Sequence, residues 1–243
     1  MKILIILLMF SWGTLFAGET NPFDKVSQKE KEKLKNTTTK ERIFEIHDLM
    51  VFSINGGLSN MAKMTGSNLI VDDENFSENL SSGLTFGLEY HRYMKEKLGF
   101  GIAFNYYTSA ASIKVMNDSG QISKLSNKVK IPTLSLAGGF KKANAEKLLM
   151  YGADLRIGGA IYQEELSVFN GSADYSCPAI IFGTNIFIEY LINKTTGLGF
   201  SCSGTLGSIS ELFAKGGSHM KLDKPLSLNR IDLLLSLKFH FNT

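Results

Sequence analysis

The sequence predicts an all-β protein: an eight-stranded, antiparallel, up-and-down transmembrane β-barrel with short periplasmic turns and long outer loops. Three observations predict this fold. Apolar and polar residues alternate along eight stretches of the chain, the connections between them alternate between short and long, and the polar positions carry mostly small residues. A period of two indicates extended strands that have one apolar face and one polar face.

The first 17 residues have the features of a signal peptide. Lys2 precedes an apolar run from Ile3 to Phe10, and Ala17 provides a small residue at the expected cleavage site. Residues 18–47 are polar and lysine-rich, and we expect them to form an N-terminal periplasmic segment before a barrel domain at 48–243. No later stretch reaches the roughly 18 to 20 apolar residues that a spanning helix needs. We therefore expect an exported chain without a helical anchor.

Composition argues against several classes of function. The 243 residues carry a net charge of +3, which is weak support for nucleic acid binding because that function usually needs a basic face. The sequence shows no metal-ligand spacing and no nucleotide-binding glycine motif, so we expect no cofactor and no metal. Cys177 and Cys202 fall on opposite faces of their predicted strands, and diverging side chains cannot be bridged without backbone movement.

The eight predicted strands follow one another with the same alternation. Their ranges are 50–59, 84–91, 98–107, 133–140, 149–161, 179–190, 198–206 and 230–242. Their outward faces include Met50, Phe52, Ile54; Leu84, Phe86, Leu88; Leu98, Phe100, Ile102; Leu134, Leu136, Phe140; Leu149, Tyr151, Leu155; Ile180, Phe182, Ile186; and Leu198, Phe200, Leu206. In the closing strand every odd position from Ile231 to Phe241 is apolar, and Leu234 is the one apolar even position.

The connections predict which rim of the barrel faces which side. Long connections are predicted at 65–82, 113–127, 165–177 and 212–227, and short ones at 95–97, 141–147 and 193–196. Short turns on one rim and long loops on the other describe an outer-membrane barrel. An even number of strands then places both ends of the barrel domain on the periplasmic side.

A soluble eight-stranded carrier barrel has the same periodicity with the apolar face turned inward. The polar face here is mostly Gly, Ser, Ala and Thr, whereas a water-exposed exterior carries many more charged residues. Small side chains suit the narrow interior of an eight-stranded barrel. The composition therefore favours the membrane barrel over the carrier.

Seven charged residues fall on the predicted inward face. They are Glu89, Asp154, Arg156, Glu189, Arg230, Asp232 and Lys238, which makes four acids and three bases. Buried charges must be paired or hydrated, so we expect a lumen charge network that closes the interior and fixes the strand register. A gated ion path or proton relay is the alternative, which the tight lumen of eight strands disfavours. We expect the Asp154/Arg156 pair to meet the Arg230/Asp232 pair.

Evidence for catalysis is weak. His219 lies beside Ser218 in a predicted outer loop, where a Ser/His pair would suit a lipid A-modifying enzyme. Adjacent residues of an extended chain point in opposite directions, so the two side chains do not form that pair without a special turn. We therefore predict no enzyme.

The chain ends in Arg230-Ile231-Asp232-Leu233 and, further on, Phe239-His240-Phe241. With eight strands and a signal peptide, it resembles the outer-membrane β-barrel domain family, the small OmpA/OmpX-like barrels, and its ending is similar to Bacteroidetes-type members. The resemblance implies an outer-membrane location, insertion by the barrel-assembly machinery, and contact with membrane lipid and lipopolysaccharide. It implies a non-enzymatic role in envelope integrity, adhesion or surface interaction, with a possible surface ligand at the outer loops. A narrow ion-conducting pore and a lipid A-modifying enzyme remain the alternatives.

Overall fold

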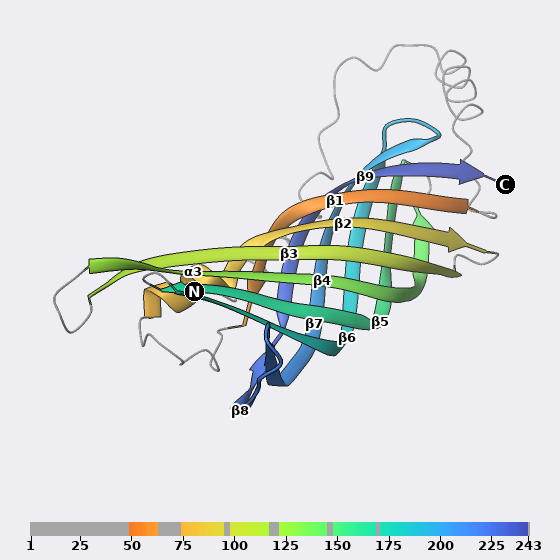
Figure 1. Cartoon of the computed structure of the whole chain (residues 1–243). Coiled ribbons are helices and arrows are strands. Elements are labelled where there is room, and N and C mark those ends of the chain that lie inside the picture. The colour runs from red at the N-terminus through yellow and green to blue at the C-terminus, as the bar shows by residue number, and fades with distance from the viewer. Residues whose placement is uncertain are drawn as a thin grey trace, which may run out of the picture. The chain divides into compact units, whose positions relative to one another are not determined.

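Nine antiparallel strands and one helix make up the described part of the chain (Figure 1). The computed structural model describes residues 49–62, 74–94, 98–116, 122–144, 148–168 and 171–242. All of them belong to one compact unit, Arg42–Thr243. The predicted signal peptide at 1–17 and the predicted segment at 18–47 lie outside the described residues.

Eight of the strands close into a ring. The ring contains β1 (Leu49–Met61), β2 (Ser82–Tyr93), β3 (Leu98–Met116), β4 (Ile122–Ala143), β5 (Leu149–Val168), β6 (Gly171–Leu191), β7 (Thr196–Ala214) and β9 (Arg230–Asn242). Each pairs with the next along the chain, β9 pairs with both β7 and β1, and β6 pairs with β7. The predicted eight-stranded, up-and-down barrel is confirmed.

The exterior of the ring is apolar over a wide band. Phe100, Leu155 and Leu235 are 64%, 70% and 69% exposed, whereas the small and charged residues of the opposite strand face are buried. A continuous exposed apolar surface that covers several strands marks a membrane or protein interface. Tyr90, Tyr151 and Tyr190 lie on this exterior near the rim of the short turns, as aromatic girdles do in membrane barrels. The barrel is therefore of the transmembrane type.

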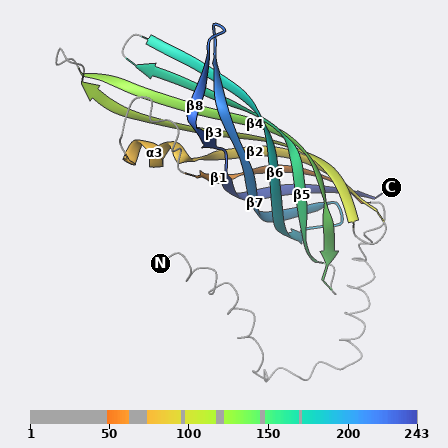
Figure 2. The same cartoon turned by 90° about the horizontal axis from the view of Figure 1, so that it is seen from below.

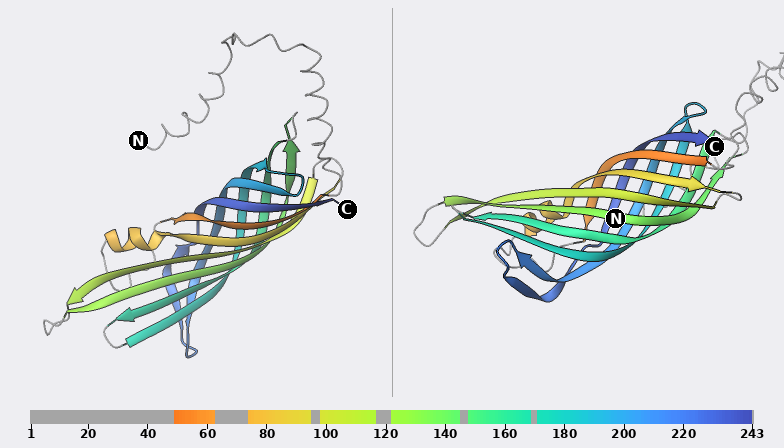
Figure 3. Two further views of the ribbon diagram at one scale, coloured as in Figure 1. Left: turned by 90° about the horizontal axis from the view of Figure 1, so that it is seen from above. Right: turned by 45° about the vertical axis from the view of Figure 1, so that its right-hand side comes forward.

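The predictions for two long loops were wrong, because the strands continue through them. β3 and β4 stay paired as far as Met116 and Ile122, and β5 and β6 as far as Val168 and Gly171. A membrane-spanning strand needs about 9–11 residues, so the 22 residues of β4 extend well beyond the membrane. Figures 2 and 3 show the β3–β4 hairpin projecting past β1 and β2. The pairing persists because apolar residues such as Leu125 and Val129 remain buried on the inner face there.

The predicted loop at 212–227 is also a hairpin. β7 turns at Gly216 and Gly217 into β8 (His219–Ser227), which pairs with the outer end of β7 outside the ring. Both glycines have positive φ, 144° and 90°, a conformation that glycine adopts at little cost.

A short helix occupies part of the predicted loop at 65–82. Helix α3 (Glu74–Ser81) buries Leu80 against the interior cluster, and the Tyr107 hydroxyl donates to the carbonyl oxygens of Leu80 (3.3 Å) and Ser81 (3.2 Å). No helix among the described residues is long and apolar enough to cross a membrane.

The interior of the barrel is layered. Leu49, Val51, Tyr93, Met150 and Leu191 form an apolar layer at the short-turn rim. A larger apolar cluster, which includes Tyr107, Tyr162 and Leu80, fills the opposite end. Polar and charged side chains occupy the layers in between.

Candidate functional site

All seven predicted inward charges are buried in the lumen. Glu89, Asp154, Arg156, Glu189, Arg230, Asp232 and Lys238 are each 8% exposed or less. They form three groups, which we name after their central residues: the Arg156, Arg230 and Glu189 clusters.

The Arg156 cluster joins three strands at mid-depth. The Arg156 guanidinium donates to both carboxylate oxygens of Glu89, from Nη1 at 3.0 Å and from Nη2 at 3.1 Å. Its Nε donates to Asp154 Oδ1 at 2.5 Å. The amide of Asn185 donates to Asp154 Oδ2 at 2.9 Å. Bidentate arginine–carboxylate pairs are both strong and geometrically specific, so this cluster links β2, β5 and β6 across the lumen.

The Arg230 cluster lies nearer the outer end. Arg230 Nε is 2.7 Å from Asp232 Oδ1, and the Thr85 hydroxyl donates to the same oxygen at 3.3 Å. The Arg230 guanidinium lies 5.0 Å from the centre of the Tyr107 ring. The expected meeting of the two Asp/Arg pairs is wrong. Each arginine binds the aspartate of its own strand, and Arg156 reaches across the lumen to Glu89 of β2 rather than to β9.

The Glu189 cluster contains a residue that the sequence analysis missed. Lys141 Nζ binds Glu189 Oε2 at 2.8 Å, and both side chains are almost fully buried. Lys238 Nζ lies 3.7 Å from the same oxygen, and His240 Nε2 contacts the other one. The sequence predicts a turn at 141–147, but β4 continues to Ala143. Extending the alternation from Gly139 by two residues would have placed Lys141 inside.

Lys141 completes the charge balance of the network. Within the three clusters, four acids, Glu89, Asp154, Glu189 and Asp232, face four bases, Lys141, Arg156, Arg230 and Lys238. Glu164 is a further buried acid at the outer end, where Asn127 and Tyr162 donate hydrogen bonds to it. Gly197 leaves the space that the Glu189 side chain occupies, because a Cβ at Gly197 would overlap Glu189 Oε1 and lie 3.0 Å from Glu189 Cγ. The network is therefore paired and densely packed.

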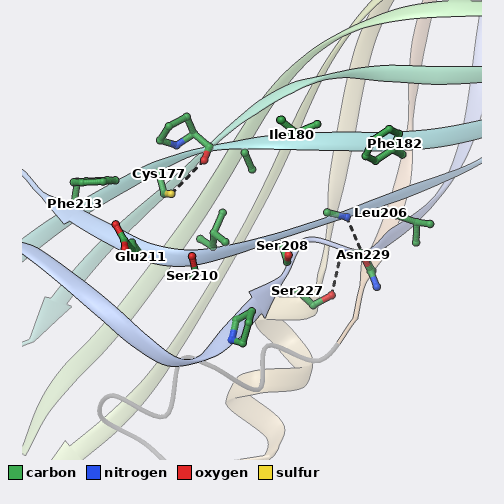
Figure 4. A pocket seen from close by; sticks show the side chains of 15 residues that line it. Cys177, Ile180, Phe182, Leu206, Ser208, Ser210, Glu211, Phe213, Ser227 and Asn229 are labelled. Carbon is green, nitrogen blue, oxygen red and sulfur yellow. Dashed lines mark hydrogen bonds between the residues drawn. The ribbon is translucent and has the colours of Figure 1, made fainter.

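A second feature is a break in the barrel wall. β6 and β7 pair up to Ile181–Gly207 and again at Ser176–Phe213, and between these two rungs the register shifts. A cleft of about 820 Å³ opens there, lined by Ile180, Phe182, Leu206, Ser208, Ser210, Glu211, Ser227 and Asn229 among others. We call it the β6–β7 cleft; Figure 4 shows side chains of both strands around it.

The two cysteines are free thiols. Cys177 is buried and lines the β6–β7 cleft, where its thiol donates to the Pro178 carbonyl oxygen at 3.3 Å. Cys202 is exposed on the outer face. The predicted inward and outward directions of these side chains are confirmed.

The extended hairpins carry charge on their outer face. Along β4, outward positions change from Lys124, Lys128 and Lys130 to Leu134 and Leu136, which places the membrane boundary near Pro132. Lys130 binds Glu165 of β5 beyond this boundary. The hydrogen bond between them raises the pKa of Lys130 and lowers the pKa of Glu165.

The Ser218–His219 motif lies at the tip of the β7–β8 hairpin. The imidazole of His219 packs at a tilt against the Phe213 ring, with 6.3 Å between ring centres. Among the described residues, no group of three or more His, Cys, Asp or Glu side chains is arranged to hold a metal ion.

No protein-family model matches the chain, and no curated protein is similar to it in sequence. Solved structures of small outer-membrane proteins are similar to it. Neisserial surface protein A aligns 97% of its chain with 79% of this one, at 9% identity and a TM-score of 0.48. A major outer membrane protein of Thermus thermophilus aligns 99% of its chain with 79% of this one, at 12% identity and a TM-score of 0.49. OprG of Pseudomonas aeruginosa aligns 98% of its chain with 81% of this one, at 12% identity and a TM-score of 0.47.

Such distant similarities concern the arrangement of strands only. The barrel assignment rests on the strand pairing and the apolar exterior of this chain itself. The Bacteroidetes-type resemblance of the ending stays a prediction.

Proposed function

We propose that the protein is a non-enzymatic, integral outer-membrane β-barrel with a closed lumen, which acts in envelope integrity or surface interaction through its outer hairpins. In this proposal outer-membrane lipid and lipopolysaccharide surround the apolar wall, and the barrel-assembly machinery inserts it. A surface ligand would bind at the extended hairpins.

The filled lumen carries this proposal. An apolar layer lies at each end, and the paired Arg156, Arg230 and Glu189 clusters lie between them. Eight-stranded barrels have interiors just wide enough for side chains to fill. A barrel whose lumen is filled by side chains offers its outer hairpins, rather than a channel, for interaction with other molecules.

The hairpins support a role outside the membrane. β3–β4 and β5–β6 extend past the lipid-facing band as paired strands, so their exposed Lys124, Lys128 and Glu165 are held on a rigid support. Ordered strands lose less conformational entropy on binding than long flexible loops do.

Two measurements on the purified protein test the barrel and the lumen. A gel-mobility difference between boiled and unboiled protein in detergent is expected for the folded membrane barrel. In planar bilayers the folded protein should give no steady conductance, and a stable single-channel current would contradict the closed lumen.

A deletion strain tests the surface role and the absence of catalysis. The full-length gene should restore resistance to detergent, and a variant with residues 112–126 replaced by a two-residue turn should fold but not restore it. The register supports this graft, because Ala111 pairs directly with Asn127. A lipid A profile that changes in His219→Ala cells would overturn the non-enzymatic proposal.

A further inference from the structure

A furrow on the outer wall leads into the β6–β7 cleft. One row of paired, outward-facing residues runs Leu155, Thr184, Gly204 and Ile231 across β5, β6, β7 and β9. Two small residues lie between two large ones, and a cavity of about 620 Å³ lies over this row. This furrow shares Phe182, Leu206 and Asn229 with the cleft, so the two hollows adjoin.

The chemistry changes along this path. The furrow is bordered by side chains of the lipid-facing wall, including Leu155, Phe182, Leu206 and Ile231. Arg156 and Arg230 also border it, but their side chains are buried in the ion pairs of the lumen. The cleft adds the hydroxyl and amide groups of Ser208, Ser210, Ser227 and Asn229 (Figure 4). Asn229 Oδ1 accepts from the Gly207 N–H at 3.1 Å, and Ser227 Oγ accepts from the Asn229 N–H at 3.2 Å. Glu211 is the one charged residue among the described residues that line the cleft.

The ladder between β6 and β7 is also interrupted in the cleft, where the Pro178 carbonyl oxygen accepts from the Cys177 thiol and β7 pairs on its other side with β8. Residues 177–180 of β6 and 208–212 of β7 face each other without the ladder that joins the strands above and below. Buried or lipid-facing backbone groups need hydrogen-bond partners. A ligand with hydroxyl groups supplies both donors and acceptors at this position.

We propose that the cleft and furrow bind one acyl chain of a membrane amphiphile whose head group is uncharged and carries hydroxyl groups. The tail lies over Thr184 and Gly204, continuous with the lipid around the barrel. The head lies between Ser208, Ser227 and Asn229 at the outer boundary of the membrane. Each hollow falls within the roughly 300–1,000 Å³ of ordinary small-molecule sites. The carboxylate of Glu211 disfavours an anionic head through like-charge repulsion.

Cys177 provides a native reporter of occupancy, because its thiol lines the cleft. In a Cys202→Ser protein it is the one remaining thiol of the barrel domain. The experiment measures the rate at which a small methanethiosulfonate labels Cys177 in detergent micelles, with increasing 1-monomyristoylglycerol. We expect a saturable decrease in rate of at least fivefold, and a clearly weaker effect of myristate at the same concentration.

Two matched glycine variants localise the tail. A Cβ at Gly204 would meet nothing closer than Thr184 Oγ1 at 3.6 Å, and one at Gly138 nothing closer than Phe100 Cδ1 at 3.8 Å. Both Gly204→Leu and Gly138→Leu are therefore expected to fold. In the Cys202→Ser background, Gly204→Leu fills the furrow and should abolish protection of Cys177. Gly138→Leu, on β4 away from the furrow, should leave protection unchanged.

The proposal rests on the barrel lying in a lipid bilayer, which the gel-mobility test examines separately. Given a folded barrel, equal labelling rates with and without the monoglyceride would overturn it. Equal protection in the Gly204→Leu and Gly138→Leu proteins would do the same. A Cys177 thiol that resists the reagent in the lipid-free protein would also contradict an open cleft.

Discussion

Lys141 of β4 reaches past β5 to bind Glu189 of β6, with 2.8 Å between Nζ and Oε2. The Lys141 and Glu189 side chains are 1% and 0% exposed. Gly152 of β5, paired with Lys141 on one side and Phe187 on the other, has no side chain in the way. The ion pair therefore links two strands whose backbones are not paired with each other.

Replacing Lys141 tests this tie. In Lys141→Met, Glu189 keeps Lys238 at 3.7 Å but loses its closest cation. Removing one partner of a buried ion pair leaves an uncompensated charge, so we expect the free energy of unfolding to fall by about 3 kcal/mol. Urea unfolding of the detergent-folded barrel measures it.

Lys142→Met is the matched control, because Lys142 is the next residue and is exposed. Its effect should stay within about 0.5 kcal/mol. Equal losses in the two variants would show that the buried pair contributes nothing particular to stability.

Gly57 is predicted to tolerate no side chain. A Cβ there would overlap the Leu233 carbonyl oxygen and lie 2.8 Å from Leu234 Cα, both backbone atoms of β9. Gly57→Ala should therefore cost roughly 1–3 kcal/mol, as overpacking does.

The neighbouring Gly56 provides the comparison, because a Cβ there meets only the Phe86 ring at 3.6 Å. Gly56→Ala should leave stability unchanged or raise it by up to about 1 kcal/mol, since alanine restricts the unfolded chain. A smaller loss for Gly57→Ala than for Gly56→Ala in urea unfolding would contradict the close approach of β1 and β9.

The Lys130–Glu165 pair predicts a pH dependence of the hairpin. The lowered pKa of Glu165 means that its contribution is present above the unfolded value of 4.5 and is lost as pH falls through the folded value. The raised pKa of Lys130 means that its contribution is present below 10.5 and is lost at higher pH. The pair thus stabilises the hairpin between the folded pKa of Glu165 and the folded pKa of Lys130. The stabilisation is weak because Glu165 is exposed.

Thermal unfolding at low salt measures this contribution. Wild type and Glu165→Gln should differ slightly in Tm at pH 7 and converge as the pH falls from 4.5 through the folded pKa of Glu165, and added salt should remove the difference. A difference that persists at low pH would mean that Glu165 acts through packing instead.

The sequence predicts the faces of the strands far better than the contacts inside the barrel. A one-residue slip would turn every Leu and Phe of the outer wall inward, so the alternation around Glu89, Asp154 and Lys238 is strongly specified. The partner of each charge depends on the stagger of strands around the ring. That is why Arg156 meets Glu89 of β2 rather than a residue of β9.

The outer end of the barrel is less predictable for a different reason. Polar, lysine-containing stretches such as 122–131 have the composition of loops, but Leu125, Val129 and Ile131 bury their side chains and keep the strands paired. The short amphipathic helix α3 forms only where tertiary packing supplies its apolar partner, since isolated helices of this length are marginal.

Leu80 is the anchor of that helix. The Leu80 side chain is 1% exposed and packs into the apolar cluster at the outer end of the lumen. The Tyr107 hydroxyl donates to the Leu80 carbonyl oxygen. Leu80→Ala should remove about 2–5 kcal/mol of local packing. Because barrel pairing does not depend on α3, we expect amide exchange within 74–81 to accelerate at least tenfold without loss of the boiled-versus-unboiled gel shift.

Glu78→Ala, at an exposed position of the same helix, should leave exchange nearly unchanged. If Leu80→Ala instead unfolds the whole barrel, the helix is part of the folding core rather than a cover on its outer end.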